Sequence, residues 1–113
     1  MTRAEGIRYR DGTAVVDLPA QIDSTAEQTL TDAYAAAAAH GSTTVLLNFA
    51  GVEFLSSTGI ALIVGILARA RKEGRAISAS GLSDHYREIF EITRLADFMT
   101  IFADENAALG GTR

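Results

Sequence analysis

Three consecutive hydroxyl side chains are the residues of this sequence best placed to carry chemistry. Ser56, Ser57 and Thr58 stand between the strand-like Phe54-Leu55 pair and a long apolar run, so one of them is expected to cap a helix and the next two to lie in its first turn. At such a position the backbone N–H groups are free and the helix dipole is positive, which favours a hydroxyl cap and accommodates an added phosphate. An ordinary cap with no further role needs the same residues, so both interpretations stand.

An enzyme reading finds little support in the sequence. The Gly-x-Ser-x-Gly frame of a nucleophile elbow is absent, because the serines lie in Leu-Ser-Ser-Thr-Gly. His40 and His85 lie far apart in the chain and show no ligand spacing to carboxylates, and the usual phosphate-binding glycine loops are missing. We therefore expect no catalytic residue, no metal site and no cofactor. An enzyme would need His40 or His85 within hydrogen-bond reach of Ser57.

Composition narrows the remaining classes of function. The 113 residues, 48% of them hydrophobic, suit one domain over residues 1–113 with a tail at 110–113. An excess of 14 acidic over 10 basic side chains, with no basic cluster to offset it, argues against nucleic acid as a partner. Cysteine is absent, the Met1 to Arg10 segment lacks an apolar run, and Gly59 to Ala68 is too short to span a bilayer. We expect a cytoplasmic protein without direct membrane insertion.

Strand and helix signals alternate along the chain. The strand signals, which are short runs of apolar and β-branched residues, are Ile7 to Tyr9, Thr13 to Leu18, Thr44 to Phe49, Ala76 to Ser80 and Phe98 to Phe102. The helix signals, which are longer runs with capping residues or a terminal glycine, are Thr25 to His40, Ile60 to Glu73, Asp84 to Arg94 and Asp104 to Leu109. This alternation predicts an α/β fold with a small mixed sheet, parallel strand pairs and about four helices.

Short local patterns predict where several elements begin and end. The Asp11-Gly12 pair is typical of a hairpin turn. Ser24 and Glu27 have the spacing of a capping box, which would start the first helix. Gly41 and Gly74 follow helical runs and are expected to terminate them.

The longest apolar runs predict the core. Ala14 to Leu18 and Val45 to Phe49 should be neighbouring strands, with the Gly59 to Ala68 helix packed on their sheet. Leu62 and Ile66 lie four residues apart on that helix, and we expect both of them in the core.

The central segment VLLNFAGVEFLSSTGIALIVGILARARKEGRAISASGL resembles the signature of bacterial STAS domains. In that family a strand ending in Asp or Asn precedes an aromatic-Met/Leu-Asp-Ser-Ser/Thr/Ala-Gly-Leu/Ile motif at the start of a helix. The matching residues here are Asn48, Phe54-Leu55 and Ser56 to Ile60. The likeness covers nearly the whole chain, including the Ile22-Asp23 pair at a helix start, and implies a STAS-type fold.

The resemblance implies an anti-sigma-factor antagonist that works by partner switching. In such proteins the unphosphorylated form binds an anti-sigma factor with serine kinase activity and frees a sigma factor, and a phosphatase later resets the phosphorylated form. The serine that is phosphorylated in the family motif corresponds to Ser57 in this sequence, and Thr58 is the secondary candidate. The partner-binding residues that the resemblance implies are Asp23, Ser56, Ser57, Thr58 and Gly59.

Two positions depart from the family pattern. The acidic residue that usually precedes the phosphorylated serine is Ser56 here, and the glycine usual before the Ile-Asp pair is replaced around Pro19-Ala20. A competing interpretation makes the chain a non-phosphorylated STAS subunit of a membrane transport complex or a signalling scaffold, in which the serine is only a cap. Phosphorylation of Ser57 discriminates between the two.

Overall fold

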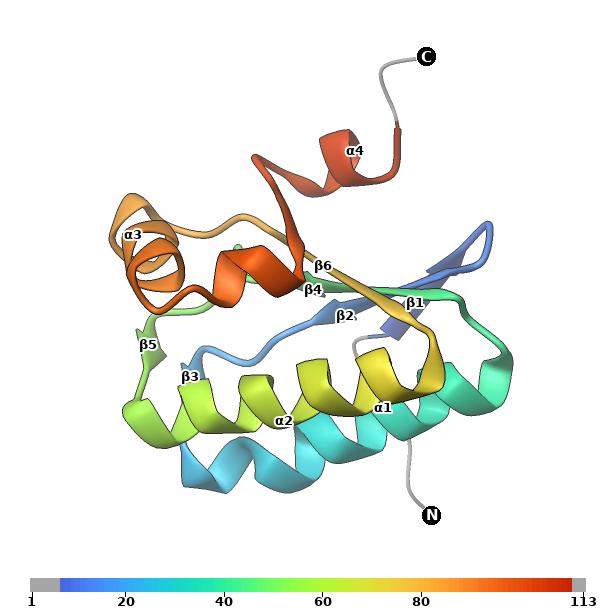
Figure 1. Cartoon of the computed structure of the whole chain (residues 1–113), viewed down its shortest axis with the longest axis horizontal. Helices are drawn as coiled ribbons and strands as arrows, with labels where there is room; N and C mark the ends of the chain where they lie inside the picture. The colour runs from blue at the N-terminus through green and yellow to red at the C-terminus, as the bar shows by residue number, and fades with distance from the viewer. Residues whose placement is uncertain (1–6, 111–113) are drawn as a thin grey trace.

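The computed structural model describes residues 7–110, which form a mixed sheet flanked by helices (Figure 1). The five strands of the main sheet, in spatial order, are β1 (Ile7–Arg10), β2 (Thr13–Asp17), β4 (Thr44–Asn48), β6 (Ala76–Ser80) and β7 (Thr100–Phe102). A separate pair joins β3 (Gln21–Ile22) to β5 (Phe54–Leu55). The helices are α1 (Glu27–His40), α2 (Ser57–Glu73), α3 (Asp84–Ile92) and α4 (Glu105–Ala108), with 3₁₀ turns η1 (Ser24–Ala26) and η2 (Leu95–Phe98). The predicted α/β class is confirmed.

The pairing of the strands follows the sequence signals closely. Strands β1 and β2 form an antiparallel hairpin whose turn residues Asp11 and Gly12 have φ values of 50° and 84°, which a primed hairpin turn requires. Strand β2 pairs in parallel with β4, and Ala14 lies opposite Val45. The predicted neighbourhood of these two apolar runs is therefore confirmed. Strands β6 and β7 extend the sheet in parallel.

Helices α1 and α2 cover one face of the main sheet (Figure 1). The inward residues of the central strands alternate with outward ones, as the pleat requires. They pack with buried side chains of both helices in one core, whose members include Ala14, Val16, Val45, Leu47, Ile77, Ala79, Leu30, Tyr34, Ile63 and Leu67. On the opposite face Val15 and Leu46 are also buried, and α4 lies on that side against β6 and β7. The predicted packing of the α2 segment on the sheet is confirmed.

The prediction that Leu62 and Ile66 lie in the core is wrong in its helical phase. The buried positions of α2 are Gly59, Ile63, Leu67 and Ala70, while Leu62 and Ile66 are only half-buried at the edges of that stripe. Apolar residues occupy almost every side of this helix, so periodicity alone does not select the inward face. The sheet and α1 select it by contact.

The start of α1 also differs from the prediction. The chain turns through η1 before α1 begins at Glu27, and the N-terminal position Ala26 makes no side-chain capping hydrogen bond. The capping box expected from Ser24 and Glu27 does not form, because Asp23 caps the preceding turn instead. At the other ends, Gly41 and Gly74 take φ values of 88° and 78° and terminate α1 and α2 as predicted.

The C-terminal elements are shorter than predicted. Helix α3 ends at Ile92, and the strand expected from Phe98 narrows to β7 because η2 occupies residues 95–98. Helix α4 spans only Glu105–Ala108 and is capped by Asp104. Residues 111–113 of the predicted tail, and the first six residues of the N-terminal segment that lacks an apolar run, lie outside the described residues. No helix within residues 7–110 has the length and hydropathy to cross a membrane.

Candidate functional site

The short strands β3 and β5 bring two distant parts of the chain together at the N-terminal end of α2. In their parallel register Ile22 lies opposite Leu55, so the residues that follow, Asp23 and Ser56, leave the pair side by side. The Ser56 N–H donates to the Ile22 carbonyl at 3.0 Å, which ties the start of α2 to β3. The site therefore depends on a pairing of segments about thirty positions apart, which a helix cap read in isolation does not reveal.

Ser56 is the N-cap of α2. Its Oγ accepts a hydrogen bond from the Gly59 N–H at 3.0 Å, and its hydroxyl also points at the Ile22 carbonyl oxygen, 3.4 Å away. The side chain is half-buried by these contacts. Ser56 thus performs the capping role that an acidic side chain also performs at an N-cap, without adding a negative charge.

Ser57 and Thr58 are the first two residues of α2, and both are exposed. Across the described part of the chain, neither hydroxyl takes part in a hydrogen bond with another residue. The adjacent serines are therefore different in kind, since Ser56 is used by the fold and Ser57 is accessible to a second protein.

Gly59 is required by the close approach of α2 to β3. A Cβ atom at this position would lie 2.0 Å from the carbonyl oxygen of Ile22 and 2.8 Å from its carbonyl carbon. Both atoms belong to the backbone of a paired strand, so they have little freedom to move aside. Gly59 is buried and sets the distance between the helix and the strand without presenting a contact surface of its own.

Asp23 places a negative charge beside the start of α2. Its Oδ1 accepts hydrogen bonds from the Thr25 hydroxyl and from the Thr25 N–H, the latter at 2.9 Å. The hydroxyl of Thr25, and then its backbone N–H, hold the pKa of Asp23 below its ordinary value. The carboxylate is therefore ionised at neutral pH.

Two aromatic residues that the sequence analysis did not assign to the site lie next to it. The Tyr86 hydroxyl accepts a hydrogen bond from the Leu55 N–H at 3.0 Å and so joins α3 to β5. Phe54, directly before Leu55, is 49% exposed. The only sequence signal for Tyr86 was its place on an apolar helical stripe, which predicts packing, whereas Phe54 stood next to the hydroxyl run as a strand residue.

The structure brings the five sequence-predicted site residues together at one end of α2, but they differ in access. Ser57 and Thr58 are exposed, Asp23 and Ser56 are half-buried, and Gly59 is buried. The two histidines make ring contacts with tyrosines. The His40 ring stacks on Tyr9 at 3.8 Å between centroids, and His85 contacts the neighbouring Tyr86 ring. Within residues 7–110, no cluster of three or more His, Asp or Glu side chains could hold a metal ion.

Comparison with known proteins identifies relatives in sequence. Anti-sigma-B factor antagonists of Staphylococcus aureus and Staphylococcus epidermidis are 33% identical to this chain over 61 residues, which are 54% of this chain and 56% of theirs. The chain thus spans about half the length of the curated relatives that it matches.

Solved structures share the fold at lower identity. The phosphorylated form of the Bacillus cell fate determinant SpoIIAA superposes with a TM-score of 0.72 at 23% identity, over 95% of this chain and 97% of SpoIIAA. A sulfate transporter family protein from Wolinella succinogenes superposes with a TM-score of 0.78 at 14% identity, over 88% of this chain and 84% of its own. One fold therefore serves regulators and a transporter family alike.

The family itself follows from the match to a family model. The model described as "Mlab, STAS domain" matches residues 6–101. This range contains the whole of the site around α2 and every strand of both sheets, except for the last residue of β7. The fold expected from the sequence resemblance is the one observed. The chain belongs to the STAS-domain family.

Proposed function

We propose that this chain is an anti-sigma-factor antagonist. It binds an anti-sigma factor with serine kinase activity in the cytoplasm, is inactivated when that kinase phosphorylates Ser57, and is reset by a phosphatase. The docking surface surrounds the N-terminus of α2 and uses Ser57 and Thr58 directly, with Asp23 beside them and with Ser56 and Gly59 holding the helix in place. The protein acts by binding, not by catalysis.

One observation carries the proposal, which is the division of labour between Ser56 and Ser57. The cap of α2 is provided by the Ser56 hydroxyl, so the Ser57 hydroxyl is not needed by the fold. An exposed hydroxyl at the first position of a helix is accessible to a kinase. The 33% identity to anti-sigma-B factor antagonists supports the choice of partner class.

Phosphorylation would act at the contact with the partner and not by refolding the domain. A phosphate adds a charge of about −1.5 to −2 and three acceptor oxygens. The N-terminus of α2 partly accommodates that charge through the helix dipole. The segments that form the site, residues 19–26 and 53–62, contain no Lys or Arg that could pair with it. In a desolvated interface the unpaired dianion would cost several kcal/mol and would release the partner.

Ser56 changes the charge around the phosphorylation site in comparison with the family motif. An acidic residue at this position would stand next to the phosphate and repel it, whereas a neutral serine does not. The acidic residues that remain in the two segments of the site are Asp23 and Glu53. We expect phosphorylated Ser57 to be less strained here than beside an acidic neighbour, and the kinase to recognise the helix start without an acidic residue directly before it.

The test begins with recovery of the partner from native cells with the tagged full chain, followed by phosphate mapping on the recovered protein. We expect phosphate on Ser57. The purified anti-sigma factor should then label the wild type but not Ser57→Ala. In binding titrations, unphosphorylated wild type and Ser57→Ala should bind within about twofold of each other, and phosphorylated wild type should bind at least about tenfold more weakly.

Thr58→Ala is the matched control, because Thr58 is the next exposed hydroxyl on the same helix turn. It should be labelled like the wild type. Ser57→Asp should weaken binding only in part, because one carboxylate charge is a poor copy of phosphate. Undiminished labelling of Ser57→Ala would remove Ser57 from the mechanism, and labelling confined to Thr58 would show that the motif register is wrong by one position.

A second candidate function is a non-phosphorylated STAS subunit of a membrane transport complex or a signalling scaffold. The observation that favours it is Ser56 itself, since the acidic residue of the phosphorylation motif is missing while the cap is kept. In that case Ser57 would carry no phosphate in cells, the recovered partner would be a transport or scaffold protein, and Ser57→Asp would bind it as well as the wild type does.

A further inference from the structure

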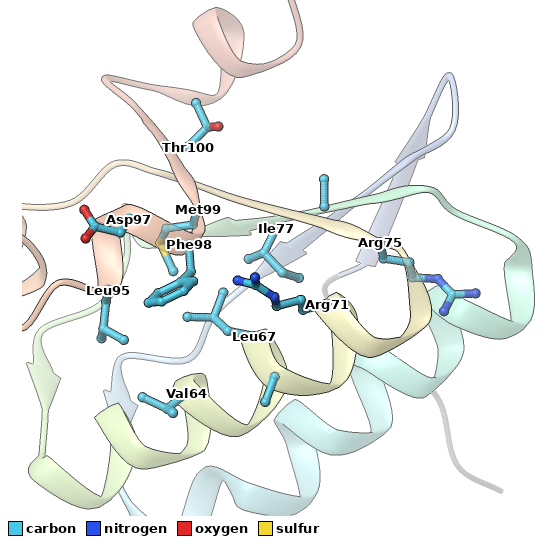
Figure 2. A pocket seen from close by; sticks show the side chains of 12 residues that line it. Val64, Leu67, Arg71, Arg75, Ile77, Leu95, Asp97, Phe98, Met99 and Thr100 are labelled. Atoms are coloured by element: carbon cyan, nitrogen blue, oxygen red, sulfur yellow. The ribbon is translucent and has the colours of Figure 1, made fainter.

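A second concave surface lies beside α2, well away from its N-terminal turn. A groove of about 570 Å³ runs between α2 and the η2 turn, next to strand β6 (Figure 2). Its floor is apolar and consists of the buried side chains Leu67, Ile77 and Met99. Its two rims are Val64, 43% exposed, and Phe98, 55% exposed. These are two of the most exposed large apolar side chains in the described part of the chain, and they face the same depression.

The groove is continuous with the Ser57 surface along one stripe of α2. Ser57, Ala61, Val64, Ala68 and Arg71 follow one another at spacings of four, three, four and three residues, and all five are exposed. Such spacings place side chains on one face of a helix, here over a length of about 21 Å at 1.5 Å per residue. Val64 and Ala68 belong to the groove lining. A protein bound at Ser57 therefore meets small side chains along α2 until it reaches the groove.

Arg71 supplies an available positive charge at the far end of this stripe. Its guanidinium lies over the Phe98 ring, 5.6 Å from the ring centroid, and forms no ion pair with any carboxylate among residues 7–110. The other arginine of the lining, Arg75, is turned away from the groove in Figure 2. Its guanidinium is bound to the Glu73 carboxylate at 2.7 Å and to the Ser42 carbonyl at 3.0 Å.

The acidic residue on the opposite rim does not cancel Arg71. Asp97 forms a 2.7 Å ion pair with Arg94, so its charge is already compensated. The groove therefore offers an apolar floor, two apolar rims and one uncompensated cation. A partner segment that presents an apolar side chain next to a carboxylate fits these features.

We propose that the groove is a second contact for the anti-sigma factor, where an apolar side chain of that partner inserts between Val64 and Phe98 and a neighbouring carboxylate pairs with Arg71. This inference rests on the proposed function, because the same partner is taken to cover Ser57. A protein segment suits the groove better than a small molecule does, since both rims are open to solvent and the stripe leads without a break from Ser57. Phe and Arg are also among the residue types that are enriched at protein interfaces.

The test uses the anti-sigma factor recovered with the full chain, in titrations with Phe98→Ala, Val64→Asp and Arg71→Glu. Each variant should bind about tenfold more weakly than the wild type. Arg71→Glu should in addition flatten the dependence of affinity on salt, because the attraction between Arg71 and the partner's carboxylate is screened by ions. Phosphorylation of Ser57 should still weaken the binding of each variant, because the two contacts lie at opposite ends of the stripe.

Tyr9→Ser is the matched control. Tyr9 is an exposed aromatic residue on β1, at the opposite edge of the five-stranded sheet from the groove. The Tyr9→Ser variant should bind the anti-sigma factor like the wild type does. Melting temperatures of all variants should show that each is folded. Equal weakening by Tyr9→Ser and Phe98→Ala would overturn the inference, because it would show that the loss is not specific to the groove.

The outcomes separate this inference from the proposed function. If phosphorylation weakens binding but the three groove variants bind like the wild type, the proposed function stands and the groove contact is wrong. If no anti-sigma factor binds the wild type, both are wrong. Two other results would overturn the inference if Phe98→Ala leaves partner affinity unchanged. A bound organic anion that native mass spectrometry finds in the wild type but not in Phe98→Ala would assign the groove to a small ligand. A dimer that light scattering finds in the wild type but not in Phe98→Ala would assign the groove to a second copy of the chain.

Discussion

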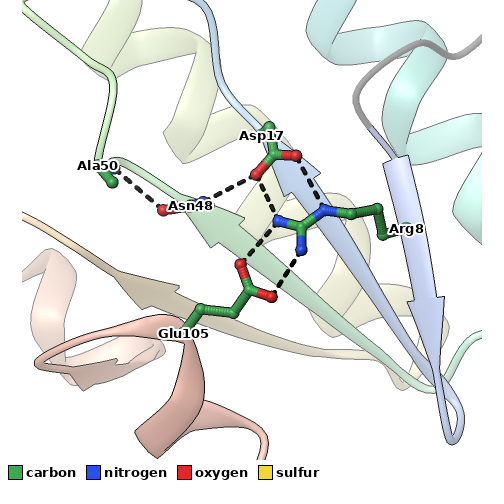
Figure 3. A network of polar contacts seen from close by, with 5 residues as sticks. All are labelled: Arg8, Asp17, Asn48, Ala50 and Glu105. Atoms are coloured by element: carbon green, nitrogen blue, oxygen red, sulfur yellow. Dashed lines mark hydrogen bonds and ion pairs between the residues drawn. The ribbon is translucent and has the colours of Figure 1, made fainter.

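The start of α2 and the polar network around Arg8 hold the molecule together in opposite ways. At the start of α2 the helix touches the backbone of β3, and the room there is so small that Gly59 has no space for a Cβ atom. Around Arg8, on the other face of the sheet, exposed side chains link β1, β2, β4 and α4 through charges (Figure 3). The first region depends on fixed distances between backbones, while the second depends on flexible side chains that water can replace.

The Arg8 guanidinium forms hydrogen bonds with two carboxylates, but the network is exposed to solvent. The Arg8 guanidinium donates to Asp17 Oδ1 at 2.6 Å and to both Glu105 oxygens at 2.7 Å, and Asn48 Nδ2 donates to Asp17 Oδ1 at 2.8 Å. The Arg8 and Asp17 side chains are 44% and 40% exposed, so solvent screens their attraction. The strand-end residue Asn48 also accepts from the Ala50 N–H, which gives that motif position a structural role in the turn after β4.

This comparison shows where the molecule tolerates change. The candidate site is built on the rigid region, so its exposed hydroxyls can change while the groups beneath them cannot. Helix α4 is held by the exposed Arg8 network and by contacts with β6 and β7. We expect substitutions at the two regions to differ severalfold in their effect on the free energy of unfolding.

The largest effect is expected from Gly59→Ala. The added methyl group would meet the Ile22 carbonyl oxygen at 2.0 Å, so α2 or β3 must shift, at a cost of about 3 kcal/mol, the upper end of the usual range for overpacking. Gly65→Ala is the control, because a Cβ there has no neighbour within 4 Å and the helix gains up to about 1 kcal/mol. Urea unfolding of both variants checks this, and equal stabilities would mean that α2 does not press on β3.

A smaller effect is expected from Ser56→Ala, which removes the cap of α2. The loss should be about 1 kcal/mol, since the Gly59 N–H loses its acceptor. Ser57→Ala should change stability by less than about 0.5 kcal/mol, because its exposed hydroxyl bonds to no other residue within 7–110. The sequence predicts only that one residue of the hydroxyl run is the cap, and the structure assigns this role to Ser56. Thermal unfolding of the two variants side by side sharpens the contrast, and a reversed order would refute the assignment of the cap.

Substitutions in the Arg8 network should cost still less. Arg8→Met removes both ion pairs and Glu105→Gln removes one, yet each should lower stability by under about 1 kcal/mol because the pairs are exposed. The difference from the wild type should shrink further at high salt. Urea unfolding at low and high salt measures both. A loss as large as that of Gly59→Ala would break the comparison between the two regions.

The smallest effect concerns pH. Burial alone would raise the pKa of Asp17, but hydrogen bonds from Arg8 and Asn48 hold it below its ordinary value of 3.8. A carboxylate with a lowered pKa in the folded state contributes stability that is present above pH 3.8 and is lost as the pH falls through the folded value. The stability difference between wild type and Arg8→Met should therefore be constant near neutral pH and decline below pH 3.8. A difference that grows in acid would contradict this sign.

Much of the fold could be predicted because its signals are local. The Asp11-Gly12 turn, the glycines Gly41 and Gly74 and the apolar runs of β2, β4 and β6 depend on residues within a few positions of each other. Backbone preferences and hydrophobic patterning act over such distances. The same applies to the hydroxyl run at the start of α2, whose capping role follows from residue types alone.

The sequence by itself determined the order and type of the five main-sheet strands and the four helices, the family resemblance and the position of the hydroxyl run. The tertiary structure decided which face of α2 points inward, which serine is the cap, and that Val64 and Phe98 line one groove. It also decided the contact between Arg8 and Glu105, which are 97 positions apart. The physical reason is the same in each case: these features depend on distances between segments remote in the chain, which packing sets and local patterns do not encode.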